Sequence, residues 1–477
     1  MGNRITSEDV LVTKKEFKEA MMRGLGRCIL ELDQTENVEK YREIVMWGCT
    51  HNLSYDTQCE GTRAWYMREL IRRFPDEKPF VDAVIQKLSR YRSNTGWEFS
   101  YYCELLGLFV QEGNRQALTA LKGKYEELYE ILKNRRRLRK NGMFPEYDDF
   151  ETLCIVLLDN APEPLAFYIK VAREIGTLML KDSALCQGSF AWLFDYSEST
   201  YGKSRVRRLL AKEARLSEAV SRYFYNMLRW NEKVPEEKHN QTAPQTTEEI
   251  LKAFDEEYRR DQESDGIVRL WGLRIGTWIK RAGNKEVPAI LAQRYLTEQN
   301  LQERTRLLGV FGRMCPFPLS PELLIHDAQT GDEMLKEAAF CALRSVRHER
   351  IRLFALELAE KGEHISETVS LLANHYQKED REVFAGLVKS IPVTYDDKED
   401  WHGAHSSVIS LLKTKGVKAA PKELLPYLYE HTLCSCCREY IVKEMGRRRM
   451  MTETVLQECL YDSNYEIRRY AERRLNI

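Results

Sequence analysis

The chain has 477 residues, of which 43% are hydrophobic and 31% charged, so it can bury the core of several domains or of one long repeat array. Its 73 basic residues balance its 73 acidic ones, which argues against a protein that coats nucleic acid with its whole surface. No run of about 18 apolar residues is present, and the first residues are polar. With its scattered cysteines, the chain is expected to be a reduced, cytoplasmic protein.

The first predicted helical region covers residues 7–32. Thr13 and Glu16 have the spacing of a capping box, and Phe17, Met21, Leu25 and Ile29 follow at four-residue steps. Another helix is predicted over 37–50.

The next segment, WGCTHNLSYDTQCEGTRAWY at 47–66, concentrates polar and aromatic residues. A functional interpretation places a polar site of His51, Asp56, Glu60 and Arg63 at a turn between helices. The structural interpretation, which we favour, makes 51–56 a turn, lets Thr57 and Glu60 cap the next helix, and buries the aromatic residues.

Helices are then predicted over 79–92, 97–112, 115–140, 150–159, 163–181, 183–195 and 203–229. Two of them are rich in basic residues, which suit either a helix C-terminus or an anion-binding patch. The candidate contacts for anions or nucleic acid are Arg135, Arg136, Arg137, Arg139 and Lys140 in the first, and Lys203, Arg205, Arg207, Arg208 and Lys212 in the second. Gly202-Lys203-Ser204 does not complete a phosphate-binding loop, because Ser197 stands where that motif needs glycine.

Residues 231–247 contain two prolines and one aliphatic residue, which is typical of a linker or long loop. We therefore expect a helical N-terminal region over 1–230, built from divergent repeats or other helices, and a repeat region over 248–477. Helices are predicted over 247–260, 264–282 and 285–297.

A spaced pattern recurs in the second region. Lys336, Ala339 and Leu343 lie three and four apart on one side of a predicted helix, Asp332–Leu343. The same spacing recurs at Arg304, Leu307 and Phe311, at Arg438, Ile441 and Met445, and at Arg468, Ala471 and Leu475, with a looser copy at His405, Val408 and Leu412 and room for a degenerate unit around 367–374. Intervals of about 30–34 residues are typical of stacked helical hairpins.

The helix Asp332–Leu343 resembles the second helix of a HEAT repeat, and Asp462–Leu475 matches that family's pattern best. The resemblance covers roughly 285–477. It implies an all-α fold, an α-solenoid of stacked antiparallel helical hairpins that is arranged in one array or in two halves.

The strongest metal candidate is the segment from His431 to Cys437. If one helix spanned it, His431, Cys434 and Arg438 would share a face while Cys436 pointed elsewhere. Zinc sites usually combine two cysteine-containing turns, and only Cys459 lies nearby in sequence, so no metal site is predicted. No catalytic or cofactor-binding motif appears either, which favours a protein without enzymatic activity and without a cofactor.

Two functions follow from these observations. The favoured hypothesis is a non-enzymatic helical-repeat scaffold that binds a partner protein through its concave surface. The alternative is a nucleic-acid-binding HEAT-like protein with activity on DNA bases, because some DNA glycosylases use HEAT-like repeats. The resemblance to those glycosylases lies only in the repeat architecture.

Overall fold

The computed structural model describes residues 13–92, 97–134, 145–181, 190–231, 244–263, 271–312, 315–391, 398–414 and 421–477. Within these ranges every regular element is an α-helix or a short 3₁₀-helix, and none is a β-strand. The all-α expectation is therefore confirmed for this part of the chain. Among the described helices, none is long and apolar enough to cross a membrane.

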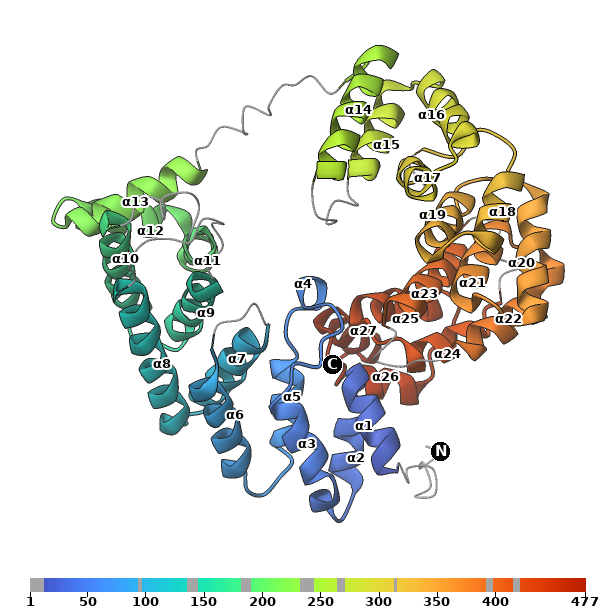
Figure 1. Cartoon of the computed structure of the whole chain (residues 1–477). Helices are drawn as coiled ribbons and strands as arrows, with labels where there is room; N and C mark the ends of the chain where they lie inside the picture. Colours follow the sequence, from blue (N-terminus) through green and yellow to red (C-terminus); the bar gives the residue numbers. More distant parts are fainter. Residues whose placement is uncertain are drawn as a thin grey trace. The chain divides into compact units, whose positions relative to one another are not determined.

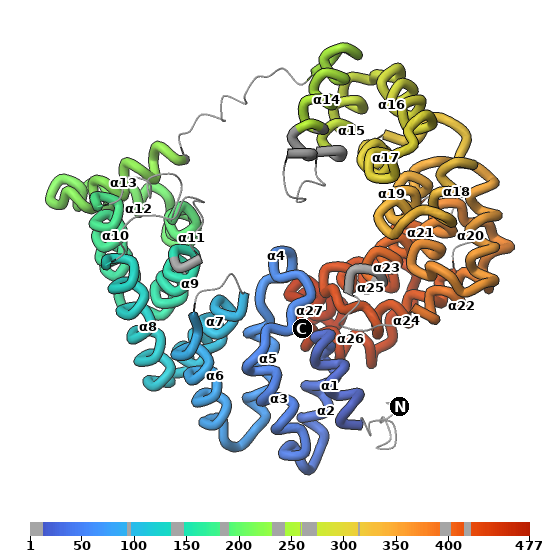
Figure 2. Tube along the Cα trace, in the orientation of Figure 1, coloured from blue at the N-terminus to red at the C-terminus, as the bar shows by residue number. Residues whose placement is uncertain are grey.

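The chain divides into two compact units, and the division does not follow the chain simply from end to end (Figures 1 and 2). Unit 1 joins Met1–Pro235 with Leu433–Ile477, and unit 2 is Glu236–Thr432. The break near residue 235 lies inside the predicted linker, most of which lies outside the described residues. The predicted repeat region over 248–477 is therefore wrong for its last part. Leu433–Ile477 belong to the same compact unit as the N-terminal region.

The first part of unit 1 consists of short helices, as predicted. Thr13 and Glu16 form the expected capping box, since each side chain bonds the other residue's backbone N–H. Phe17, Met21, Leu25 and Ile29 are all buried. The elements are α1 (Lys14–Arg23), α2 (Arg27–Gln34), η1 (Val38–Tyr41), α3 (Arg42–Cys49), α4 (Thr57–Glu60), α5 (Ala64–Ile71), α6 (Lys78–Arg90), α7 (Glu98–Gln111) and α8 (Arg115–Asn134).

The next helices correct two boundaries. The segment 203–229 is two helices rather than one, because the chain turns at 215–217 and Ser217 Oγ accepts the N–H of Val220 at the new start. The helix predicted over 183–195 begins at Ala191 and continues to Tyr201, while 182–189 lie outside the described residues. The elements are α9 (Pro145–Asp159), α10 (Pro164–Lys181), α11 (Ala191–Tyr201), α12 (Lys203–Ala214) and α13 (Glu218–Asn231).

Unit 2 is built from helices that pack against helices near them in sequence, such as α18 on α19 and α20 on α21. The expected start at Asp332 is confirmed, because its carboxylate accepts the N–H of Leu335 as an N-cap. The elements are α14 (Thr247–Glu263), α15 (Trp271–Ala282), α16 (Glu286–Thr297), α17 (Leu301–Leu308), α18 (Glu322–Thr330), α19 (Glu333–Leu343), α20 (Glu349–Lys361), α21 (Ile365–His375), η3 (Lys378–Asp380), α22 (Arg381–Ser390), α23 (Lys398–Lys413) and α24 (Leu424–His431).

The chain then returns to unit 1 with α25 (Ser435–Arg447), α26 (Glu453–Cys459) and α27 (Tyr465–Leu475). On α25 the predicted repeat positions Arg438, Ile441 and Met445 are all buried. Helix α25 contacts both α4 and α27, so the last helices pack against an early helix as well as against each other. These contacts are the reason that both ends of the chain belong to unit 1.

One ionic contact recurs in both units. Arg304 pairs with Asp327 and Arg352 with Asp380 in unit 2, and Arg438 pairs with Asp462 in unit 1. Each aspartate side chain is at most 2% exposed. In every case the arginine lies on a helix and the aspartate lies 23 to 28 residues later in the chain, so each pair ties neighbouring segments together.

Candidate functional site at the junction of the chain ends

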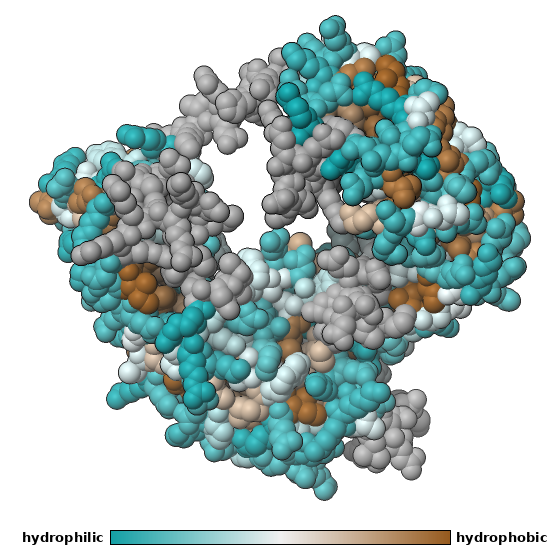
Figure 3. Space-filling view, viewed as in Figure 1, coloured by the Kyte–Doolittle hydropathy of each residue, from teal (hydrophilic) through white to brown (hydrophobic). Residues whose placement is uncertain are grey.

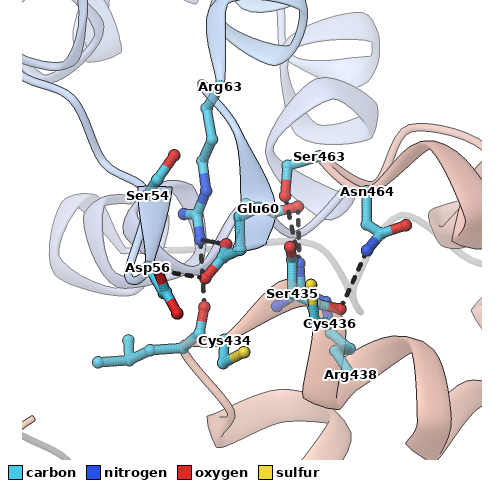
Figure 4. A network of polar contacts seen from close by, with 12 residues as sticks. Ser54, Asp56, Glu60, Arg63, Cys434, Ser435, Cys436, Arg438, Ser463 and Asn464 are labelled. Atoms are coloured by element: carbon cyan, nitrogen blue, oxygen red, sulfur yellow. Dashed lines mark hydrogen bonds and ion pairs between the residues drawn. The ribbon is translucent and has the colours of Figure 1, made fainter. Parts of the chain in front are cut away.

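A buried polar network lies in unit 1, where α4 and α5 meet the start of α25 and the turn before α27 (Figure 4). The contributing segments, 54–63 and 433–464, are separated by about 370 residues of chain, as the spacing of Arg63 and Leu433 shows. We call this network the junction, defined by the residues labelled in Figure 4 together with Gly24, Cys59, Leu433, Cys437 and Asp462.

Arg63 holds the N-terminal side of the junction to the C-terminal side. Its guanidinium is buried, pairs with the Glu60 carboxylate at 3.2 Å, and donates to the carbonyl oxygen of Leu433 at 3.1 Å. It also donates to the carbonyl oxygen of Met22. The side chains of Arg63 and Glu60 are 3% and 1% exposed, so water scarcely competes with this pair.

Asp56 and Glu60 are fixed by the geometry of α4. The Asp56 carboxylate accepts the N–H groups of Gln58 and Cys59 as the N-cap of this one-turn helix. In return, the N–H of Asp56 donates to Glu60 Oε1 at 3.1 Å. The short helix thereby presents Glu60 to Arg63.

Arg438 lies at the opposite side of the junction and is fully buried. Its guanidinium makes two bonds to the Asp462 carboxylate, at 2.8 and 3.0 Å, and both side chains are 0% exposed. It also donates to Ser463 Oγ and to the carbonyl oxygen of Gly24, at 3.3 and 3.4 Å. A bidentate pair of this kind fixes the orientation of the two side chains as well as the distance between them.

The backbones approach closely at two glycines. Gly24 has φ 75° and its carbonyl oxygen accepts the N–H of Ser463 at 2.9 Å, so a Cβ there would lie 2.2 Å from Ser463 Oγ. A Cβ at Gly26 would lie 1.9 Å from the carbonyl oxygen of Glu458. Beside them, the Arg468 guanidinium lies 3.6 Å from the ring centroid of Trp65.

Four cysteines lie around the junction. Cys434 is the N-cap of α25, and its sulfur accepts the N–H of Cys437 at 3.5 Å. The Cys436 thiol donates to the carbonyl oxygen of Cys59 at 3.5 Å. The pKa values of the Cys436 and Cys437 thiols are raised, first by hydrogen bonding to Cys434 and then by burial, with Glu60 adding to the effect.

The structure brings together three of the four residues of the predicted polar site. Asp56, Glu60 and Arg63 are linked as described above, whereas His51 is exposed, stacks on Trp47 and keeps Nδ1 2.8 Å from the Trp47 carbonyl oxygen. The predicted capping of the next helix was wrong for Thr57, because Asp56 is the N-cap of α4. Glu60 does accept the N–H of this N-cap residue, and it also pairs with Arg63.

The predicted relation of His431 to the cysteines is also corrected. His431 ends α24 and Cys434 is the N-cap of α25, so no single helix carries both. The chain is extended at Thr432 and Cys434, which breaks the periodicity on which that prediction depended. Sequence reasoning missed Cys59 as a neighbour of Cys436, because nothing local to either residue indicates the other.

The first predicted basic run, Arg135, Arg136, Arg137, Arg139 and Lys140, lies outside the described residues. In the second, Arg207 pairs with Glu198, whereas Lys203, Arg205, Arg208 and Lys212 are exposed on α12. Arg207 therefore has its charge balanced by Glu198, whereas the other four basic side chains of this group face solvent.

No protein-family model matches this chain, and no curated protein matches it in sequence. The junction is a network of buried charged pairs, in which the loss of one partner would leave the other buried without its counterion. The basic surface of α12 has a different character, because its charges are open to solvent.

Proposed function

We propose that this chain is a non-enzymatic, HEAT-like α-solenoid that binds an acidic partner protein, and that the exposed basic stripe of α12 is the main contact. The stripe is Arg205, Arg208 and Lys212. Support for the HEAT-like repeat comes from the recurring Arg–Asp pairs and from helices that pack on their neighbours in sequence. Support for the contact comes from the exposure and the positive charge of the three side chains of the stripe.

The stripe follows from helical spacing. Positions 205, 208 and 212 are three and four residues apart, so their side chains share one side of α12. Val206 and Leu210 are fully buried on the other side, which fixes the helix with its basic side toward solvent. Among the described residues, none forms an ion pair with Arg205, Arg208 or Lys212; Arg208 donates only to the carbonyl oxygen of Ser204.

Exposed aromatic side chains accompany the stripe on the adjoining helices. Trp192 on α11 is 60% exposed, and Tyr225 and Trp230 on α13 are 58% and 38% exposed. Elsewhere the visible surface is mainly hydrophilic with separate hydrophobic patches (Figure 3). Exposed tryptophan, tyrosine and arginine are the residue types most enriched among the strong contacts of protein interfaces.

The alternative of nucleic-acid binding is favoured by the same mixture of basic and aromatic residues, because phosphates pair with arginine and lysine and bases stack on aromatic rings. On this hypothesis α12 would contact the backbone, and activity on DNA bases would require residues that no motif identifies. The balanced total charge favours the protein partner, since nucleic-acid-binding surfaces usually leave a domain strongly basic.

The two functions are separated by reversing the stripe. The triple variant Arg205→Glu, Arg208→Glu, Lys212→Glu should lose the partner, because three attractive contacts become repulsive. Cross-linking and affinity capture from the native host, quantified by mass spectrometry, measure this loss. The matched control, Lys14→Glu, Lys15→Glu, Arg473→Glu, makes the same charge change at exposed positions on α1 and α27.

The expected result is an acidic protein that is recovered with the wild type and the control but not with the triple variant. Fluorescence anisotropy with single-stranded and duplex DNA, at two salt concentrations, runs in parallel. Salt-sensitive DNA binding that the triple variant abolishes, without any captured protein that depends on the stripe, would replace the proposed function by the alternative. Equal capture by all three proteins, together with DNA binding that the triple variant keeps, would contradict both.

A further inference from the structure

The start of α25 carries two cysteines that the proposed function does not use. Cys434 is the N-cap of the helix and Cys437 lies at its third position. Both are free thiols, and their sulfur atoms lie within 4.8 Å of each other. The N–H of Cys437 donates to Cys434 Sγ at 3.5 Å, so the Cys434 side chain lies across the first turn, toward Cys437. The two thiols therefore form a close pair within a single helical turn.

The backbone of this turn has the dimensions that a disulfide needs. Cα atoms three residues apart on a helix are about 5 Å apart, and a disulfide spans roughly 4.4–6.8 Å between Cα atoms. The N–H of Arg438 donates to the carbonyl oxygen of Cys434 at 3.0 Å, which holds the turn closed. A sulfur–sulfur bond of about 2.05 Å can therefore form by rotation of the two side chains, without unwinding of α25.

The third cysteine of this segment, Cys436, is directed elsewhere. It also has a hydrogen bond to Cys434, but its thiol donates to the carbonyl oxygen of Cys59 at 3.5 Å. Residues two apart on a helix do not face each other, which disfavours a bond from Cys434 to Cys436. Cys437 is half-buried and Cys434 is 4% exposed. A reagent from solvent therefore reaches Cys437 first, and Cys434 is placed to react with it next.

We propose that Cys434 and Cys437 form a redox-active dithiol, which a small-molecule disulfide such as glutathione disulfide oxidises to an intramolecular disulfide. The Cys437 thiolate attacks one sulfur of glutathione disulfide, and the first glutathione leaves and takes up the proton that Cys437 lost. The Cys434 thiolate then attacks the Cys437 sulfur, and the second glutathione leaves with the proton of Cys434. The protein loses two electrons, and glutathione disulfide gains them.

The surroundings of the pair favour the closed disulfide. The pKa of the Cys437 thiol is raised, first by its hydrogen bond to Cys434 and then by burial, with the charge of Glu60 adding to the effect. A sulfur whose thiolate is disfavoured is a poor leaving group, so the disulfide should resist reduction once it has formed. The ring would also fix the residue after Leu433, whose carbonyl oxygen accepts a hydrogen bond from Arg63. Oxidation would thus reinforce the junction, independently of the basic stripe on α12.

The test equilibrates the reduced full chain with mixtures of reduced and oxidised glutathione, without oxygen and at mildly alkaline pH. Acid quenching, alkylation of the remaining thiols and peptide mass spectrometry then locate every bond. The wild type should lose two alkylatable thiols in this segment and gain a disulfide between Cys434 and Cys437. The matched control, Cys436→Ser on the same turn, should form the same disulfide.

Two further variants separate the roles of the pair. Cys434→Ser should keep glutathione bound to Cys437, because no second thiol displaces it. Serine is itself a good N-cap, so this variant preserves the start of α25. Cys437→Ser should leave Cys434 free, because the remaining thiol is buried.

Exposed Cys59 shows that the reagent has reached the protein, because its modification by glutathione requires no neighbouring thiol. Free Cys434 and Cys437 in a wild type whose Cys59 carries glutathione would overturn the proposal. A disulfide from Cys436 to Cys434 or to Cys59 would also overturn it. In denaturing urea the pair should be less oxidised by the same mixture, since the folded turn is lost. Equal oxidation of native and unfolded chains would show that the fold does not build this site.

Discussion

At the scale of single residues, the junction is dominated by buried charge. Arg438 and Asp462 are both removed from water, and moving two ions out of water costs several kcal/mol each before their attraction is counted. The structure compensates this cost with two direct bonds between them and with further bonds to Gly24 and Ser463. Removal of one partner is therefore far more damaging than removal of an exposed ion pair.

Replacing Arg438 by methionine should lower the stability of unit 1 by about 3–5 kcal/mol, because the Asp462 carboxylate would remain buried without its counterion. Urea denaturation followed by hydrogen exchange of peptides from α25 and α27 measures the change. The control is Lys78→Met on α6, whose pair with Asp82 is exposed and should contribute little. Equal shifts for the two variants would show that the Arg438 pair does not hold the junction.

At the scale of elements, close helix contact depends on small residues. Gly176 on α10 is an example: a Cβ there would lie 1.8 Å from the carbonyl oxygen of Ala219 on α13. These two helices pack closely against each other, and the hydroxyl groups of Tyr168 and Tyr223 share a hydrogen bond of 3.0 Å between them. The backbone of α13 leaves no room for a side chain on α10 at this point.

Gly176→Ala should therefore destabilise unit 1 by about 1–3 kcal/mol, because α13 must move away from α10. Gly123→Ala is the matched change, since Gly123 lies inside α8 and a Cβ there meets nothing within 4 Å. It should stabilise the protein by about 0.4–1 kcal/mol by restricting the unfolded chain. Thermal denaturation of both variants tests the pair, and a shift in the same direction for both would contradict the argument.

At the scale of the whole molecule, the return of the chain end to unit 1 has the largest consequence. Helices α25–α27 cover surfaces of the first helices through Arg63, Gly24 and Trp65. Without residues 433–477, Arg63 and the carbonyl oxygen of Gly24 would lose these partners, and the ring of Trp65 would lose its contact with Arg468. The early helices should therefore depend on the last ones, although most of the sequence lies between them.

Deletion of residues 433–477 should increase hydrogen exchange in α1, α2 and α5, because their contacts with α25–α27 are lost. Exchange in α9–α13 should change much less and serves as the internal control, since those helices pack on one another. Hydrogen-exchange mass spectrometry of full-length and truncated protein makes the comparison. Unchanged protection in α1, α2 and α5 would mean that the first helices are stable without the chain end.

Local sequence patterns predicted most of the helical segments and where several of them begin. The capping box at Thr13, the start of a helix at Asp332 and the apolar stripe from Phe17 to Ile29 were all predicted. Such signals work because helix start and face are encoded within a few residues of each other. The turn that separates α12 from α13 was missed, since both sides continue the same periodicity and no glycine or proline marks the break.

Which distant segments meet became visible only in the folded chain. The sequence grouped Asp56, Glu60 and Arg63, but it could not show that Arg63 reaches Leu433 or that Cys59 lies beside Cys436. The physical reason is that packing between helices far apart in the chain depends on shape and burial at both surfaces together, and neither surface alone specifies its partner. For this chain, the return of its last helices to its first ones is therefore a property of the folded molecule.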